Sequence, residues 1–138
     1  MKLDKRNINL IKKLYFQKLR DSHIYGVLSR KIKIEEISET FGELSYINYS
    51  HSNNIELFVN NYGHKISSIK KFLVEYNAFW FGVVIFRFGK AISKYFLQME
   101  EKKNLNLLSK IQPDILKDDT FIEIINETNN NLKKIKSF

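Results

Sequence analysis

The sequence predicts an all-α protein, and three observations lead to this fold class. Apolar residues recur at helical spacing in most segments. One proline and five glycines in 138 residues leave few of the turns that an all-β fold requires. Apolar residues make up 43% of the chain, enough for a core, and the length is that of one domain. We therefore expect a single helical domain over residues 1–138.

The first third of the chain contains two predicted amphipathic helices. Between Lys5 and Ser29, apolar residues such as Ile8 and Ile11 recur at helical spacing, and Gly26 marks a candidate break. A second helix begins near Lys33, with Ile34, Ile37, Phe41 and Leu44 on one stripe. Glutamates near its start suit the positive end of the helix dipole.

The segment Ser45–Asn61 contains a polar run that is typical of a loop. We expect a loop followed by a short helix over Asn54–Tyr62 that ends at Gly63. A β-hairpin flanking the loop stays open as an alternative.

The most informative segment is Phe79–Phe96, which is apolar on nearly every side. A helix of this kind belongs in the middle of a domain, with other helices packed around it. A buried strand could have the same composition, but the pattern continues for too many residues without a turn signal. We therefore expect one continuous, central, hydrophobic helix, preceded by a short helix over Ile66–Leu73.

The remaining third predicts shorter helices. One includes Leu105–Ile111 and is stopped by Pro113, and one or two more lie within Asp114–Asn126. The expected fold is then about seven short helices around the central one. The apolar stretch Ala78–Phe86 is far shorter than the ~20 residues that a membrane-spanning helix needs. We expect no transmembrane anchor.

Residues that could carry chemistry are few. The histidines His23, His51 and His64 are not spaced as metal ligands, and no phosphate-binding loop or nucleophile motif occurs. We expect no enzyme activity, no metal and no cofactor. The net charge is +8, and the basic run that includes Lys12, Lys18 and Arg20 is interpreted as a solvated helix face, so nucleic acid is not an expected partner.

Four segments, in order, resemble the homology segments of the Bcl-2 family of apoptosis regulators. Asn9–Tyr25 is similar to the fourth segment, and Ile34, Ser38, Glu39 and Phe41 fill the key positions of the third (BH-3) segment. Lys71–Gly89, which ends in an aromatic–glycine pair, resembles the first, and Pro113–Ile125 the second. The short chain is most similar to compact viral members. The resemblance implies a Bcl-2-like helical bundle.

One departure concerns ligand binding. Where the family's first segment has Asn-Trp-Gly-Arg, this chain has Ala78–Phe81. The arginine that pairs with an aspartate of the ligand is therefore missing, and Arg87 on the same predicted helix is its candidate substitute.

The resemblance implies an anti-apoptotic protein that sequesters BH-3 helices of death-promoting proteins in a hydrophobic groove. It carries over a set of groove residues. They are Phe41, Tyr49, Ile69, Phe72, Leu73, Phe81 and Arg87.

The same resemblance implies a location in the host cytoplasm or at the mitochondrial surface, with peripheral membrane contact and a homodimer as open possibilities. Two alternatives remain: a Bcl-2-fold viral inhibitor of innate immune signalling with an occluded groove, and a basic helical nucleic-acid binder.

Overall fold

The computed structural model describes residues 3–138, and these residues form six helices and no strand. The helices are α1 (Lys5–Lys31), α2 (Glu35–Asn61), α3 (Ser68–Arg87), α4 (Lys90–Lys110), α5 (Pro113–Leu116) and α6 (Asp119–Lys136). The all-α prediction is confirmed, with six helices rather than about seven. The hairpin alternative is excluded for the described residues.

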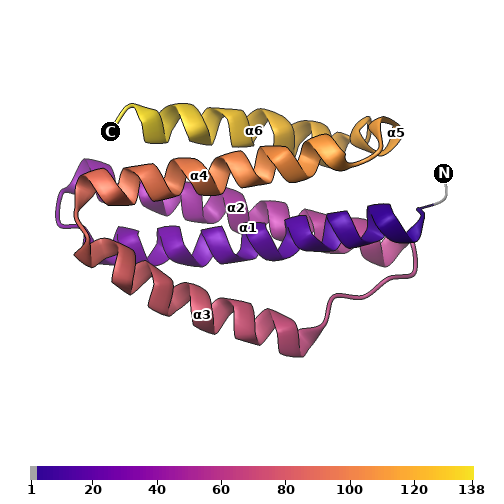
Figure 1. Ribbon diagram of the computed structural model, residues 1–138, viewed down its shortest axis with the longest axis horizontal. Helices are drawn as coiled ribbons and strands as arrows, with labels where there is room; N and C mark the ends of the chain where they lie inside the picture. Colours follow the sequence, from indigo (N-terminus) through magenta and orange to yellow (C-terminus); the bar gives the residue numbers. More distant parts are fainter. Residues whose placement is uncertain (1–2) are drawn as a thin grey trace.

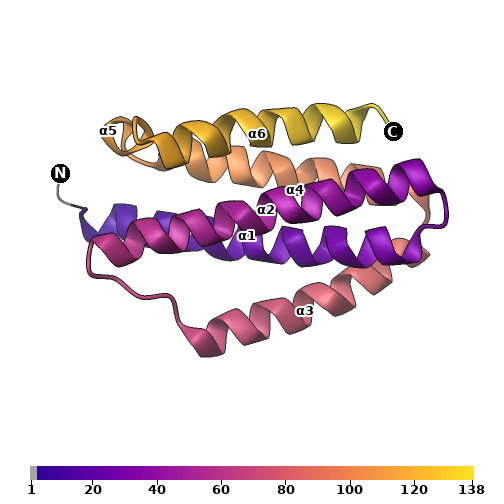
Figure 2. The same cartoon turned by 180° about the vertical axis from the view of Figure 1, so that it is seen from behind.

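Four long helices form the body of the molecule. α1 packs against α2 and α4, and α6 closes the bundle by packing against α4 and α2. α3 lies alone on the side of α1 that is remote from α6, and its N-terminal end splays away from the bundle (Figures 1 and 2). The central helix is therefore α1, of which 14 of 27 residues are buried.

The predicted central helix over Phe79–Phe96 is wrong in two respects. Gly89 divides the segment into α3 and α4. Its φ of 90° is a backbone conformation that residues with a Cβ atom rarely adopt. The α3 half lies on the outside of the molecule, and only Ala78, Gly82 and Ile85 of its 20 residues are buried. An apolar composition did not bring burial, because α3 packs mainly on one neighbour, α1.

The predicted loop after Leu44 is also wrong, because α2 continues through it to Asn61. Its polar residues bond back to helix carbonyls: Asn48 Nδ2 donates to the Leu44 carbonyl at 2.8 Å, and Ser52 Oγ to that of Tyr49 at 2.7 Å. Tertiary packing thus overrides their weak helix propensity.

Gly26 does not break α1, although the sequence marked it as a candidate break. It lets α2 approach, since a Cβ there would lie 3.3 Å from Ser45 Oγ.

Two apolar clusters fill the bundle. One includes Ile11, Leu19, Phe58 and Phe121, and the other includes Tyr25, Leu44, Leu97 and Ile135. The two clusters are separated by about three turns on α2, α4 and α6 and by little more than one turn on α1, and those turns carry buried polar residues. None of the helices within residues 3–138 combines the length and the apolar character needed to cross a bilayer.

Candidate helix-binding surface

The outward side of α3 carries a stripe of large apolar side chains. The stripe, called here the α3 ridge, consists of Ile69, Phe72, Leu73, Tyr76, Phe79 and Trp80. All six are exposed, from 77% for Ile69 to 44% for Phe79. Large exposed apolar patches on a soluble protein mark sites of interaction.

The spacing of the ridge follows from helix geometry. Relative to the first residue, its members lie at i, i+3, i+4, i+7, i+10 and i+11, so they share one side of the helix at about 100° per residue. The buried residues Ala78, Gly82 and Ile85 lie on the opposite side, against α1. α3 therefore has one stripe for the bundle and a second stripe without a partner among the described residues.

Gly82 brings α3 close to α1. A Cβ built at this position would lie 2.8 Å from the Val27 Cβ, so only glycine permits the observed approach. Farther along, the guanidinium of Arg20 lies 4.8 Å from the centre of the Phe81 ring, and the Lys70 ammonium lies 4.6 Å from that of Phe16. These contacts hold the inner side of α3 and leave the ridge free.

The segment that contains the ridge is basic in sequence. Between His64 and Met99 the sequence has six lysines or arginines and one acid, Glu75. That acid lies 3.8 Å from His23 Nε2 on α1, on a side of α3 away from the ridge. A partner with negative charge beside an apolar stripe would be complementary to this part of the surface.

The structure distributes the predicted groove residues over several places. Ile69, Phe72 and Leu73 belong to the α3 ridge, and Phe81 lies beside it, with its ring centre 5.0 Å from that of Phe96. Arg87 is exposed in the last turn of α3.

The other two predicted residues lie elsewhere. Phe41 is buried and lines an apolar pocket at the end of the bundle, and Tyr49 borders a separate, polar hollow with His23 and Arg30. The expectation that all seven line one groove is wrong, because it assumed a central helix that the fold does not have.

A second feature was not predicted: a layer of buried polar side chains between the two apolar clusters. This layer, called here the polar centre, comprises Lys18, Asp21, Asn48, His51, Ser52, Glu100, Glu101, Asn104, Thr128 and Asn131. Lys18 Nζ donates to Thr128 Oγ1 at 2.7 Å and to Asn48 Oδ1 at 3.2 Å. The interpretation of Lys18 as part of a solvated face is therefore wrong.

The charges of the polar centre are shifted by burial. Desolvation lowers the pKa of Lys18 and raises that of Asp21 well above its usual range, and a hydrogen bond with Glu100 adds to the rise at Asp21. Desolvation also raises the pKa of Glu101, whose Oε1 accepts from Tyr25 at 2.5 Å. Desolvation and the charge of Lys18 lower the pKa of His51 to about 2.

The polar centre is a structural layer within the described residues. Residues 3–138 hold no group of three or more histidines and acids that could bind a metal ion. A signal for this layer exists in the sequence, because Lys18 follows Ile11 and Leu14 at helical spacing and thus falls on the core stripe of α1.

Comparison with known proteins adds no relative. No protein-family model, no curated protein and no solved structure matches this chain. The resemblance to the Bcl-2 family consequently depends on the four sequence segments, and the site depends on the geometry of α3.

Proposed function

We propose that this protein binds an amphipathic helix of a partner protein along the α3 ridge. The observation that carries the proposal is the spacing of the ridge, since i, i+3, i+4 and i+7 is the pattern by which one helix packs against another. Aromatic side chains such as Phe72 and Trp80 are also the residue types that dominate binding energy at interfaces.

The partner class that the sequence favours is the BH-3 helix of death-promoting proteins. Two observations support it: the four segments similar to Bcl-2 homology segments, and the exposed Arg87 in the last turn of α3, which lies 18 residues after Ile69 and thus on the side of the helix that carries the ridge. An acidic residue beside the apolar stripe of the partner helix would pair with Arg87. By sequestering such helices the protein would act against cell death, by blocking mitochondrial permeabilisation.

This binding mode differs from a groove. The partner helix would lie on the outer side of α3, and α1 would lie on the inner side, so α3 would be sandwiched between two helices. Phe72 and Leu73 would supply central anchors, while Ile69 and Trp80 would lie nearer the two ends of the contact.

Fluorescence titration offers a direct test, because Trp80 is the single tryptophan of the chain and lies in the ridge. Adding BH-3 peptides should shift its emission to shorter wavelength in a saturable way, since the indole leaves water. Phe72→Ser should weaken binding at least tenfold, as expected for loss of an aromatic anchor. The matched control is Leu57→Ser, which removes an equally exposed apolar side chain from α2.

Three outcomes would contradict the proposal. One is the absence of a shift with every peptide. Another is equal weakening by Phe72→Ser and Leu57→Ser. The third is a shift caused by vesicles of anionic lipid and by no peptide, which would assign the ridge to a membrane surface instead.

A further inference from the structure

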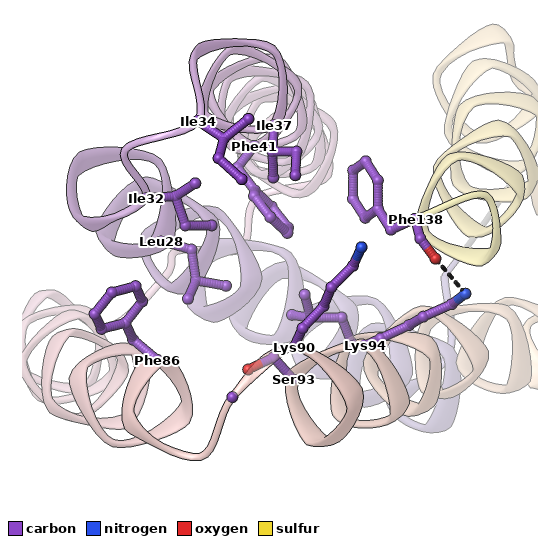
Figure 3. Close-up of a pocket in the computed structure, with 12 residues that line it drawn as sticks. Leu28, Ile32, Ile34, Ile37, Phe41, Phe86, Lys90, Ser93, Lys94 and Phe138 are labelled. Atoms are coloured by element: carbon purple, nitrogen blue, oxygen red, sulfur yellow. Dashed lines mark hydrogen bonds between the residues drawn. The ribbon is translucent and has the colours of Figure 1, made fainter.

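An apolar pocket lies at the end of the bundle where α1, α2, α3 and α4 meet, away from the α3 ridge. Its volume is about 240 Å³. Figure 3 shows side chains converging on it from Leu28 and Ile32 of α1 and its cap, Ile37 and Phe41 of α2, and Phe86 of α3. Phe138 closes the side next to α6.

The deep part of this pocket is lined by apolar side chains. Leu28, Phe41 and Leu97 are each buried to 5% exposure or less, and the Phe41 ring lies between those of Tyr25 and Phe138, at 5.9 and 5.3 Å between ring centres. The Ser93 hydroxyl on the wall already donates to the Ile85 carbonyl at 2.9 Å. The interior therefore offers contact to an alkyl chain and almost no hydrogen bonds.

The mouth of the pocket carries positive charge. Lys94 Nζ donates to the Phe138 carbonyl oxygen at 2.6 Å. Lys90 extends over the opening between Phe41 and Phe138, and within the described residues its ammonium has neither a hydrogen bond nor an ion pair (Figure 3). α4 also begins here, at Gly89, which has no side chain to cap the first N–H groups.

We propose that this pocket binds a medium-chain fatty acid, with the alkyl tail against Leu28, Phe41 and Leu97 and the carboxylate beside Lys90. The apolar interior selects the tail, and the unpaired ammonium selects an anionic head over a neutral or cationic one. The pocket is smaller than the usual range for drug-sized ligands, so we expect a chain of about eight to ten carbons to fill it.

One acid without an ion pair among the described residues lines a neighbouring hollow together with Lys90 and would compete with a bound carboxylate for its charge. Glu36 borders the neighbouring hollow together with Lys90, whereas Glu43 in that hollow is 3.8 Å from Lys134 and is thereby paired. Removing the charge of Glu36 should therefore strengthen binding of a carboxylate, and removing that of Lys90 should weaken it.

Calorimetric titration with hexanoate, octanoate and decanoate tests the proposal. Affinity should rise about fourfold for each methylene until the pocket is full, which is the usual gain for burying a CH₂ group. Octanol and octyltrimethylammonium, with the same tail and no negative charge, should bind at least tenfold more weakly than octanoate.

Variants locate the site. Lys90→Gln should weaken octanoate about tenfold, and Glu36→Gln should strengthen it. Lys102→Gln, the same change at an exposed position of α4, is the control and should leave affinity unchanged. All three positions are exposed, so the fold should persist, and circular dichroism checks this.

Four results would overturn the proposal: no saturable binding of any carboxylate, equal affinity for octanol, no effect of Lys90→Gln, or displacement of octanoate by a BH-3 peptide that binds in the pocket itself. Phe72→Ser on the α3 ridge should leave octanoate binding unchanged. The two sites can therefore fail separately.

Discussion

The apolar side chains of Phe72 and Trp80 on α3 are exposed to solvent, whereas the charged side chains of Lys18 and Glu101 are completely buried in the bundle of α1, α2, α4 and α6. The difference follows from the number of neighbours that each helix has. α1 packs against α2, α3 and α4, so even its polar residues are covered, but α3 packs mainly on α1. Position in the assembly of helices, and not the polarity of a side chain alone, decides what is buried.

The two regions should respond differently to substitution. Buried polar groups of the polar centre depend on one another for hydrogen bonds, and removal of one leaves the others unpaired at considerable cost. Side chains of the α3 ridge have few contacts within the chain, so their removal should affect binding and leave the fold intact. The following predictions test this contrast.

The largest effect is expected for Lys18→Ala. The substitution leaves Thr128 and Asn48 without their partner and opens a cavity in the bundle, so the free energy of unfolding should fall by about 3–5 kcal/mol. Urea denaturation measures this change. Lys13→Ala, at an exposed position of the same helix, should alter stability by no more than about 0.5 kcal/mol. Equal effects would show that Lys18 is not buried.

The second prediction concerns the contact of α3 with α1. Gly82→Ala places a methyl group against Val27, where it has no room, and should destabilise the protein by about 1–3 kcal/mol despite the better helix propensity of alanine. In a Val27→Gly background the same substitution should cost much less, because the clashing atoms are gone. Additive effects of the two changes would contradict the observed approach of the helices.

The third prediction is a pH dependence that His51 causes. Its pKa falls from 6.5 to about 2 in the folded chain, so the folded state keeps the imidazole neutral while the unfolded chain takes up a proton below pH 6.5. The stabilisation is complete above pH 6.5 and is lost as the pH falls. Between pH 7 and pH 5 the loss should be about 2 kcal/mol relative to His51→Gln.

The groups facing His51 do not reverse this direction. Lys18 on α1 opposes protonation by its charge, and Glu127 on α6, with Oε1 3.2 Å from Nε2, is the one acid in hydrogen-bond contact. The raised pKa values of Asp21 and Glu101 act in the opposite sense, but they are common to both proteins and cancel in the comparison. A difference between the two proteins that is independent of pH would contradict the burial of His51.

The smallest effect on stability is expected at the α3 ridge. Phe72→Ser should change the free energy of unfolding by less than about 0.5 kcal/mol, because the ring is 67% exposed. In the core, Phe121→Ala should cost about 3–5 kcal/mol, because Phe121 is fully buried between the helices. Thermal denaturation of both variants measures the difference. Similar losses of stability would mean that the ridge is covered.

The sequence predicted the fold class and most helix starts, because amphipathic periodicity and caps are local. Pro113 follows the end of α4, as predicted, and Asp4 is a local cap that the sequence analysis did not single out: it accepts from the Asn7 amide at 2.8 Å. The length of α2 was not predictable from local signals. Its polar middle is helical because Asn48, His51 and Ser52 face the polar centre, which only the assembled bundle provides.

Three of the predicted binding residues, Ile69, Phe72 and Leu73, do lie together on one surface, as helical spacing requires. What periodicity could not supply was the environment of α3. A helix that is apolar on all sides is expected to be buried, and nothing local to Phe79–Arg87 indicates that one side faces solvent. The polar centre was missed for the converse reason, since a lysine is assigned to the surface by default.

Quenching of Trp80 fluorescence by acrylamide tests the central claim, that the α3 ridge is exposed, most directly. With Trp80 52% exposed, emission should lie nearer to that of tryptophan in water than to that of a buried indole, and the quenching constant should be at least half that of the unfolded chain. The quenching constant should also stay the same when the protein is diluted. Emission at short wavelength with strong protection at every concentration would place the ridge inside the molecule, and the helix-binding function would then have no surface.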